Sequence, residues 1–73
     1  HQDASLYRLW LQTGEAAGHA LAAQRTAYLH VVSGAIEVNG KTLVEGDGAT
    51  VSDVAEINFS ALQESEALLF DLP

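Results

Sequence analysis

Apolar and polar residues alternate with a period of two along most of the chain. In residues 55–61, Ile57 and Phe59 alternate with Glu56 and Asn58. Because successive side chains of a β-strand point to opposite faces of its sheet, this alternation predicts a half-buried strand. The same reasoning predicts further strands at residues 6–12, 27–32, 49–51 and 67–72.

Asn39 and Gly40 are predicted to join two strands in a hairpin. This dipeptide supplies the positive φ angles of a type I′ turn, whose twist matches that of the flanking strands. The turn pairs Ile36 with Leu43, and alternation places these two residues and Val38 on one face. A slip by one residue would move that apolar face into solvent, so the turn and the pattern predict the same register.

Residues 15–24 are rich in alanine, which favours a helix by propensity. Gly14 and Gly18 interrupt the segment, so we favour a short strand followed by a loop. Further turns are predicted at Gly34 and Gly46. Together, about seven or eight short antiparallel strands separated by turns predict an all-β sandwich or barrel.

The chain has 73 residues, enough for one small domain that spans residues 1–73. A domain of this size buries only about 60% of the surface that its unfolded chain exposes, so we expect a partner surface to contribute to its stability. The chain has no cysteine, which fits a reducing, cytoplasmic environment. It begins with His1 rather than methionine, so we expect either a piece of a longer polypeptide or a chain that carries the remnant of a tag.

The charge balance argues against two classes of partner. Ten acidic residues against three basic ones give a formal net charge of −7. Nucleic acids and anionic membranes are both disfavoured, because each is bound mainly through Lys and Arg. No apolar run approaches the roughly 20 residues of a membrane span, and no signal peptide is visible in the sequence.

Trp10 and Leu6 share one face of the first predicted strand, opposite Tyr7, Leu9 and Leu11. If the latter three residues fill the interior, Trp10 points outward. Exposed aromatic residues beside leucine are common at protein interfaces. We therefore predict that Trp10 and Leu6 form an interface, the alternative being that Trp10 is an ordinary core residue.

The order of glycines and histidines resembles the motifs of the cupin family. Gly14 resembles the opening glycine of the first cupin motif and His19 its first histidine. Residues 28–34 look like the strand and closing glycine of that motif, and Gly46-Asp47 looks like the Gly-Asp turn of the second. The resemblance spans nearly the whole chain and implies a small jelly-roll barrel.

Both ends of the chain resemble a narrower group. HQDASLYRLWLQTGE at residues 1–15 and ALLFDLP at residues 67–73 are similar to the C-terminal cupin of pirin-like two-cupin proteins. Several of those proteins are described as quercetin 2,3-dioxygenases. The resemblance implies that the metal and the dioxygenase chemistry belong to an N-terminal cupin, which this chain does not contain.

The chain departs from the cupin ligand set at each remaining position. Leu21 stands where the second histidine after His19 is expected, Gln24 or Arg25 lies near the expected glutamate, and residues 55–57 cover the region of the final histidine. The resemblance therefore implies no cofactor in this chain and no dioxygenase activity for the chain alone.

His19 and His30 are the candidate metal ligands that remain. His30 could meet His19 across neighbouring strands and, with Glu37 or Glu56, hold a divalent ion. The alternative is an exposed or hydrogen-bonded histidine near the barrel mouth for His19, and a histidine satisfied within a sheet or at an interface for His30. His1 lies at the terminus and carries little weight as a ligand.

Two functions from different classes follow. The first is a non-catalytic domain that packs against an N-terminal cupin, or against a second copy of itself in a homodimer. The second is a stand-alone small cupin enzyme or small-molecule binder with a partial histidine metal site. Association that depends on Trp10 would favour the first function, and metal loading that depends on His19 or His30 would favour the second.

Overall fold

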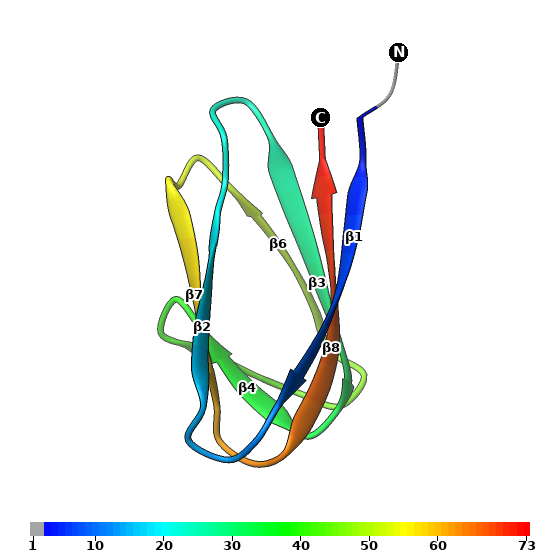
Figure 1. Cartoon of the computed structure of the whole chain (residues 1–73), viewed down its shortest axis with the longest axis vertical. Helices are drawn as coiled ribbons and strands as arrows, with labels where there is room; N and C mark the ends of the chain where they lie inside the picture. Colours follow the sequence, from blue (N-terminus) through cyan, green and yellow to red (C-terminus); the bar gives the residue numbers. More distant parts are fainter. Residues whose placement is uncertain (1–2) are drawn as a thin grey trace.

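The computed structural model describes residues 3–73 as eight antiparallel strands in two four-stranded sheets (Figure 1). The first sheet has the order β1-β8-β3-β6 and the second the order β2-β7-β4-β5. The all-β prediction is confirmed. No helix in the described part of the chain is long and apolar enough to span a membrane. The strands are β1 (Ser5–Leu11), β2 (Ala16–Ala20), β3 (Thr26–Ser33), β4 (Ala35–Val38), β5 (Lys41–Val44), β6 (Gly48–Ser52), β7 (Glu56–Ala61) and β8 (Ser65–Leu72).

The hydrophobic core lies between the two sheets. Leu29 and Leu69 project into it from the first sheet, and Ile36, Ile57 and Phe59 project from the second. Each of these side chains is at most 2% exposed. The alternation of residues 55–61 therefore predicted the buried face of β7 correctly, because the sheet has one face on the core and one in solvent.

The β4–β5 hairpin has the predicted turn and register. Asn39 and Gly40 have φ angles of 47° and 86°, and Ile36 pairs with Leu43. Ile36, Val38 and Leu43 are all buried. The positive φ angles required by the turn are those that Asn and Gly adopt at least cost.

Residues 15–24 form a strand and a loop, as predicted, and no helix. β2 pairs with β7 over its whole length, with His19 opposite Ile57. The loop after β2 includes Gln24, whose φ is 67°. Pairing with β7 supplies hydrogen-bond partners for the backbone of β2. The helix propensity of the alanines therefore does not decide the conformation of this segment.

Gly34 occupies a tight corner of the fold, where the chain turns from β3 into β4. Its φ is 90°, and a Cβ at this position would clash with Ser65 Oγ and with the Glu64 carbonyl oxygen. The Ser65 hydroxyl is buried; it accepts a hydrogen bond from the Ala35 N–H (3.0 Å) and donates one to the Gln63 carbonyl (2.6 Å). Glycine is thus required here both by the backbone angle and by the close approach of the β7–β8 turn.

We predict that Gly34→Ala lowers the free energy of unfolding by about 3 kcal/mol, the sum of a positive φ and a steric clash. Gly40→Ala is the matched control, because Gly40 has a similar φ of 86° but no atom within 4 Å of the added Cβ. We expect that control to cost about 1 kcal/mol. Urea unfolding of both variants measures the difference, and equal losses would contradict the steric argument.

Candidate functional site

Asp71 is a charged residue on the core face of β8. The inward positions of this strand are Ser65, Ala67, Leu69 and Asp71, all of which are buried. Asp71 is 8% exposed. Burying a carboxylate is unfavourable unless it is paired and hydrogen-bonded, so the partners of Asp71 define a constrained cluster.

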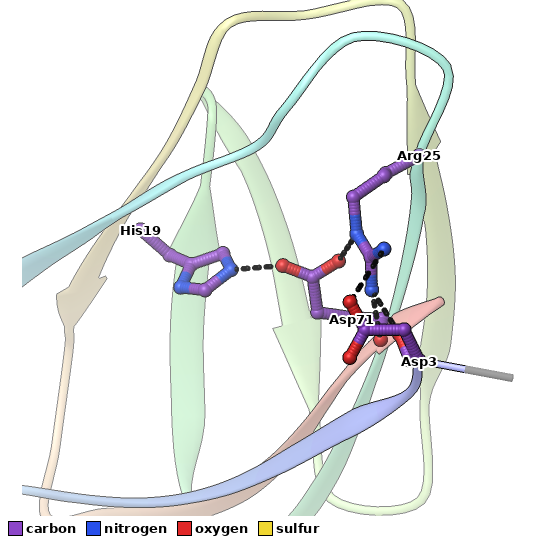
Figure 2. Close-up of polar contacts among 4 residues, drawn as sticks. All are labelled: Asp3, His19, Arg25 and Asp71. Carbon is purple, nitrogen blue, oxygen red and sulfur yellow. Dashed lines mark hydrogen bonds and ion pairs between the residues drawn. The ribbon is translucent and has the colours of Figure 1, made fainter. Parts of the chain in front are cut away.

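His19 and Arg25 supply those partners (Figure 2). His19 Nε2 lies 2.7 Å from Asp71 Oδ2, and Arg25 Nε donates to Asp71 Oδ1 at 2.5 Å. Arg25 Nη2 also donates to the Asp71 carbonyl oxygen at 3.0 Å. His19 comes from β2, Arg25 from the loop between β2 and β3, and Asp71 from β8, so the cluster links the two sheets.

The charges of the cluster are mutually stabilised. A hydrogen bond from Arg25, and to a smaller extent one from His19, holds the pKa of the Asp71 carboxyl below its ordinary value. The Asp71 carboxylate in turn raises the pKa of Arg25. Asp71 is therefore ionised at neutral pH, and the guanidinium provides its counter-charge.

Two further residues extend the cluster toward solvent. The Tyr7 ring lies against the His19 imidazole, with ring centroids 5.0 Å apart at an angle of 57°. Arg25 Nη2 donates to the Asp3 carbonyl oxygen at 2.6 Å, and Arg25 Nη1 lies 3.9 Å from Asp3 Oδ2. Tyr7 belongs to the inward side of β1 but remains 43% exposed.

This donor set does not fit a metal ion. One imidazole nitrogen of His19 is already engaged by Asp71, and the Arg25 guanidinium carries a positive charge and no lone pair to donate to a cation. Within residues 3–73, no group of three or more His, Cys, Asp or Glu residues is placed to hold a metal ion. Arg25 lies near the position where the cupin motif has a glutamate ligand. Its positive charge therefore disfavours a cation at this position.

His30 does not meet His19. β2 and β3 belong to different sheets, which corrects the idea that these histidines face each other across neighbouring strands. His30 pairs with Leu68 and shares the outer side of β3 with Tyr28, whereas His19 points inward. Glu37 and Glu56 are on the exposed sides of β4 and β7. His1 lies outside the described residues.

The outer side of the first sheet carries an apolar surface. The register aligns Leu6 with Phe70 and Phe70 with Tyr28 across three strands, and Trp10 lies farther along β1. Leu6 and Trp10 are 58% and 60% exposed. The prediction that Trp10 points outward is confirmed, and its alternative as a core residue is wrong. We call this surface the outer apolar face; it consists of Leu6, Trp10, Tyr28, Leu68, Phe70 and Leu72.

Arg8 lies on this face between Leu6 and Trp10, and it forms an ion pair with Glu66, the residue opposite Trp10. Arg8 Nε donates to Glu66 Oε2 at 2.6 Å, and the Arg8 guanidinium carbon lies 4.7 Å from the centroid of the Trp10 ring. The guanidinium thus contacts both a carboxylate and an aromatic face, an arrangement that holds the indole in place. Tryptophan and arginine are both enriched at protein interfaces.

A pocket of about 450 Å³ opens at the end of the sandwich nearest the polar cluster. It is lined by residues 21–25 and 53–55. Both loops contain a non-glycine residue with a positive φ, Gln24 at 67° and Asp53 at 61°. Most of the lining is apolar, and Arg25 contributes the one basic side chain among the residues that line it.

Sequence reasoning missed Asp71 as the centre of the cluster. The signal was present, because Asp71 follows Leu69 by two residues in an alternating strand and so must share its face. A charged residue on the apolar side of a predicted strand indicates an interior partner. The partners themselves, 46 and 52 residues away, are not marked by any local pattern.

Comparisons with known proteins identify relatives along the whole chain. The family model described as "Quercetinase C-terminal cupin domain" matches residues 1–72. The chain is 41% identical over 73 residues to quercetin 2,3-dioxygenase of Escherichia coli K12, covering 100% of this chain and 32% of that protein. It is 39% identical over 69 residues to a pirin-like protein of Caulobacter vibrioides, covering 94% of this chain and 30% of that protein.

Comparison with solved structures identifies proteins of the same kind. The Escherichia coli bacterial pirin YhhW in complex with nickel(II) superposes with a TM-score of 0.97 at 41% identity, over 100% of this chain and 32% of that chain. KdgF from a Halomonas species has a TM-score of 0.79 at 22% identity, over 97% of this chain and 69% of that chain, and supports the fold alone. The predicted cupin-type fold is confirmed. The chain spans about a third of the length of the curated relatives that it matches.

We predict that Asp71→Asn lowers the free energy of unfolding by about 2 kcal/mol at pH 7, because the charge-assisted hydrogen bonds are lost. The folded-state pKa of Asp71 is depressed, so its contribution is complete above about pH 4 and declines as the pH falls through that folded-state pKa. The difference between the two proteins should therefore persist from pH 7 to about pH 5 and close in stronger acid.

Urea unfolding across this pH range measures the effect. Asp47→Asn is the control, because Asp47 is exposed and its carboxylate accepts a hydrogen bond from the Val44 N–H (3.0 Å). We expect the control to cost at most about 1 kcal/mol. A stability difference for Asp71→Asn that does not change with pH would contradict the role assigned to the ionised carboxylate.

Proposed function

Because the chain belongs to the quercetinase C-terminal cupin domain family, we propose that it is a non-catalytic cupin that packs against a preceding cupin domain and completes that domain's cavity. In this proposal the metal-dependent, dioxygenase-type chemistry resides in the preceding domain. The present chain contributes a rigid wall and a docking surface. The absence of cysteine supports a cytoplasmic setting.

The outer apolar face is the observation that carries this proposal. An antiparallel sheet with one face on the core usually has polar residues on the other face. Here the outer face of the first sheet has Leu6 and Trp10 exposed and Phe70 and Leu72 half-buried. An apolar surface of this kind, which includes the Arg8–Glu66 ion pair beside Trp10, favours association with another protein surface.

The size of the chain supports the same conclusion. The relatives extend about two thirds of their length beyond the matched segment, and the family description places that segment at the C-terminal side. A 73-residue domain buries a small core, so an additional apolar contact would contribute substantially to its stability. The natural occupant of the outer apolar face is therefore the preceding domain, and a second copy of this chain is the alternative occupant.

The donor set supports a non-catalytic role. The nickel(II) of the Escherichia coli YhhW structure is a property of that protein. In the present chain, the Asp71 carboxylate pairs with the Arg25 guanidinium and with the His19 imidazole. These three side chains bind one another, so they are not free to coordinate a metal ion. A dioxygenase-type metal centre would have to lie in the domain that precedes them.

The pocket at the end of the sandwich favours a second candidate, a small-molecule binder. Its volume of about 450 Å³ falls within the range common for ligand sites. The walls formed by Ala22, Ala23, Val54 and Ala55 would suit an apolar ligand, with Arg25 as a fixed polar group. This candidate would not require the outer apolar face to be covered.

We predict that Trp10→Ala weakens association with the preceding cupin about 30-fold, because tryptophans that become buried in an interface commonly dominate binding. Leu62→Ala is the control, since Leu62 is 51% exposed but lies in the turn between β7 and β8. The measurement is calorimetric titration of the chain with the separately expressed preceding part of the Escherichia coli relative. Equal affinities for the two variants would contradict docking through the outer apolar face.

The oligomeric state of the chain alone distinguishes the alternative occupant. Sedimentation equilibrium that shows a dimer dissociated by Trp10→Ala would identify a second copy on the same face. A monomer that still binds the preceding domain would support the proposed arrangement.

We predict that elemental analysis of the purified chain finds no stoichiometric iron, nickel, copper or zinc, because the guanidinium of Arg25 already neutralises the Asp71 carboxylate. His19→Ala and His30→Ala are measured alongside. Stoichiometric metal that is lost in His19→Ala would contradict the non-catalytic proposal. It would favour the stand-alone enzyme instead.

A further inference from the structure

Arg25 contacts the chain at both ends of the domain. Its Nη2 donates to the Asp3 carbonyl at 2.6 Å and to the Asp71 carbonyl at 3.0 Å, and its Nε donates to Asp71 Oδ1. Asp3 precedes β1, and Asp71 lies near the end of β8. Figure 2 shows the guanidinium between these two aspartates, and Figure 1 shows that β1 begins where β8 ends.

Arg25 connects the buried Asp71 to the exposed Asp3. The side chains of Asp71 and Arg25 are 11% and 20% exposed, whereas that of Asp3 is 83% exposed. The carboxylate of Asp71 is held on its other side by His19. Because a guanidinium is planar and rigid, fixing its Nε side also fixes the direction of its Nη donors. Arg25 thus connects the residues just before β1, Asp3 and Ala4, to the interior of the sandwich. We call these two residues the entering segment.

The entering segment leads directly to the outer apolar face. β1 starts at Ser5, and Leu6 is the first residue of that face, three positions after Asp3. In the relatives, the rest of the protein precedes the matched segment, because the match covers 32% of their length and belongs to a C-terminal domain family. A preceding domain is therefore connected within a few residues of the surface on which it is proposed to dock.

We propose that Arg25 is a positioning residue that fixes the segment entering β1 and so orients the preceding domain against the outer apolar face. This inference rests on the proposed packing function. Arg25 does so through the Asp3 backbone carbonyl, which is present whatever side chain occupies position 3. The short connection and the fixed direction together raise the effective concentration of the preceding domain at Leu6 and Trp10.

The alternative is that Arg25 only stabilises the fold by pairing with Asp71. Arg25→Lys separates the two roles, because a lysine ammonium retains the charge beside Asp71 but lacks the planar fork needed to reach Asp3 as well. Asp3→Ala is the companion variant: it removes only the 3.9 Å side-chain contact and keeps the carbonyl that accepts from Nη2.

The first readout is the ¹⁵N relaxation of the Ala4 and Ser5 amides in the 73-residue chain. We expect their order parameters to fall from about 0.85 to below about 0.6 in Arg25→Lys, and to stay near the parent value in Asp3→Ala. A merely stabilising ion pair would lower the midpoint of unfolding without loosening these amides. Unchanged order parameters in Arg25→Lys would overturn the proposal.

The second readout uses a two-domain polypeptide, made by joining the preceding part of the Escherichia coli relative to His1 of this chain. Small-angle X-ray scattering and domain-to-domain residual dipolar couplings report the relative placement of the domains. Arg25→Lys should broaden that placement while each domain keeps its own spectrum. A looser entering segment with an unchanged domain arrangement would overturn the positioning role.

Trp10→Ala in the same two-domain polypeptide tests the proposed function separately. If Trp10→Ala leaves the domain arrangement unchanged, docking through the outer apolar face is wrong whatever Arg25 does. If Trp10→Ala separates the domains and Arg25→Lys does not affect them, docking stands and the inference about Arg25 fails. Disruption by both variants, with loosened Ala4 and Ser5 amides in Arg25→Lys, supports both proposals.

Discussion

The buried carboxylate of Asp71 is the constraint on which the rest of the site depends. A charge on the core face of β8 is tolerated only because Arg25 and His19 satisfy both of its oxygens. Those partners come from the second sheet and from the loop that follows it, so the requirement to pair Asp71 also fixes how the two sheets meet at this end. The same requirement commits the side chains that would otherwise be available for a cation.

This commitment is one reason why residues 3–73 have the cupin fold but no group of three or more side chains placed to hold a metal ion. The fold is set by two sheets that enclose an apolar core, and that core needs no metal. The fold of a cupin therefore does not by itself imply its chemistry. The distinctive feature of this chain lies on the outside instead, where Leu6 and Trp10 give the first sheet a second apolar face.

The strands, the turns and the outward direction of Trp10 could be predicted because they follow from short-range rules. Period-two alternation assigns Ile57 and Phe59 to the core, and Asn39-Gly40 sets the hairpin register. The alternative in which His19 meets His30 across neighbouring strands does not hold, because β2 and β3 belong to different sheets. Alternation shows that a residue shares a face with its neighbours two positions away, but it does not show which strands lie side by side in space.

The sequence by itself determined the all-β class, the turns at Gly34, Asn39-Gly40 and Gly46, and the family to which the chain is similar, because these depend on residues close together along the chain. Only the tertiary structure decided that β2 and β3 lie in different sheets and that Asp71 meets partners 46 and 52 residues away. Such contacts depend on the order of strands within the two sheets, which no local pattern of residues encodes.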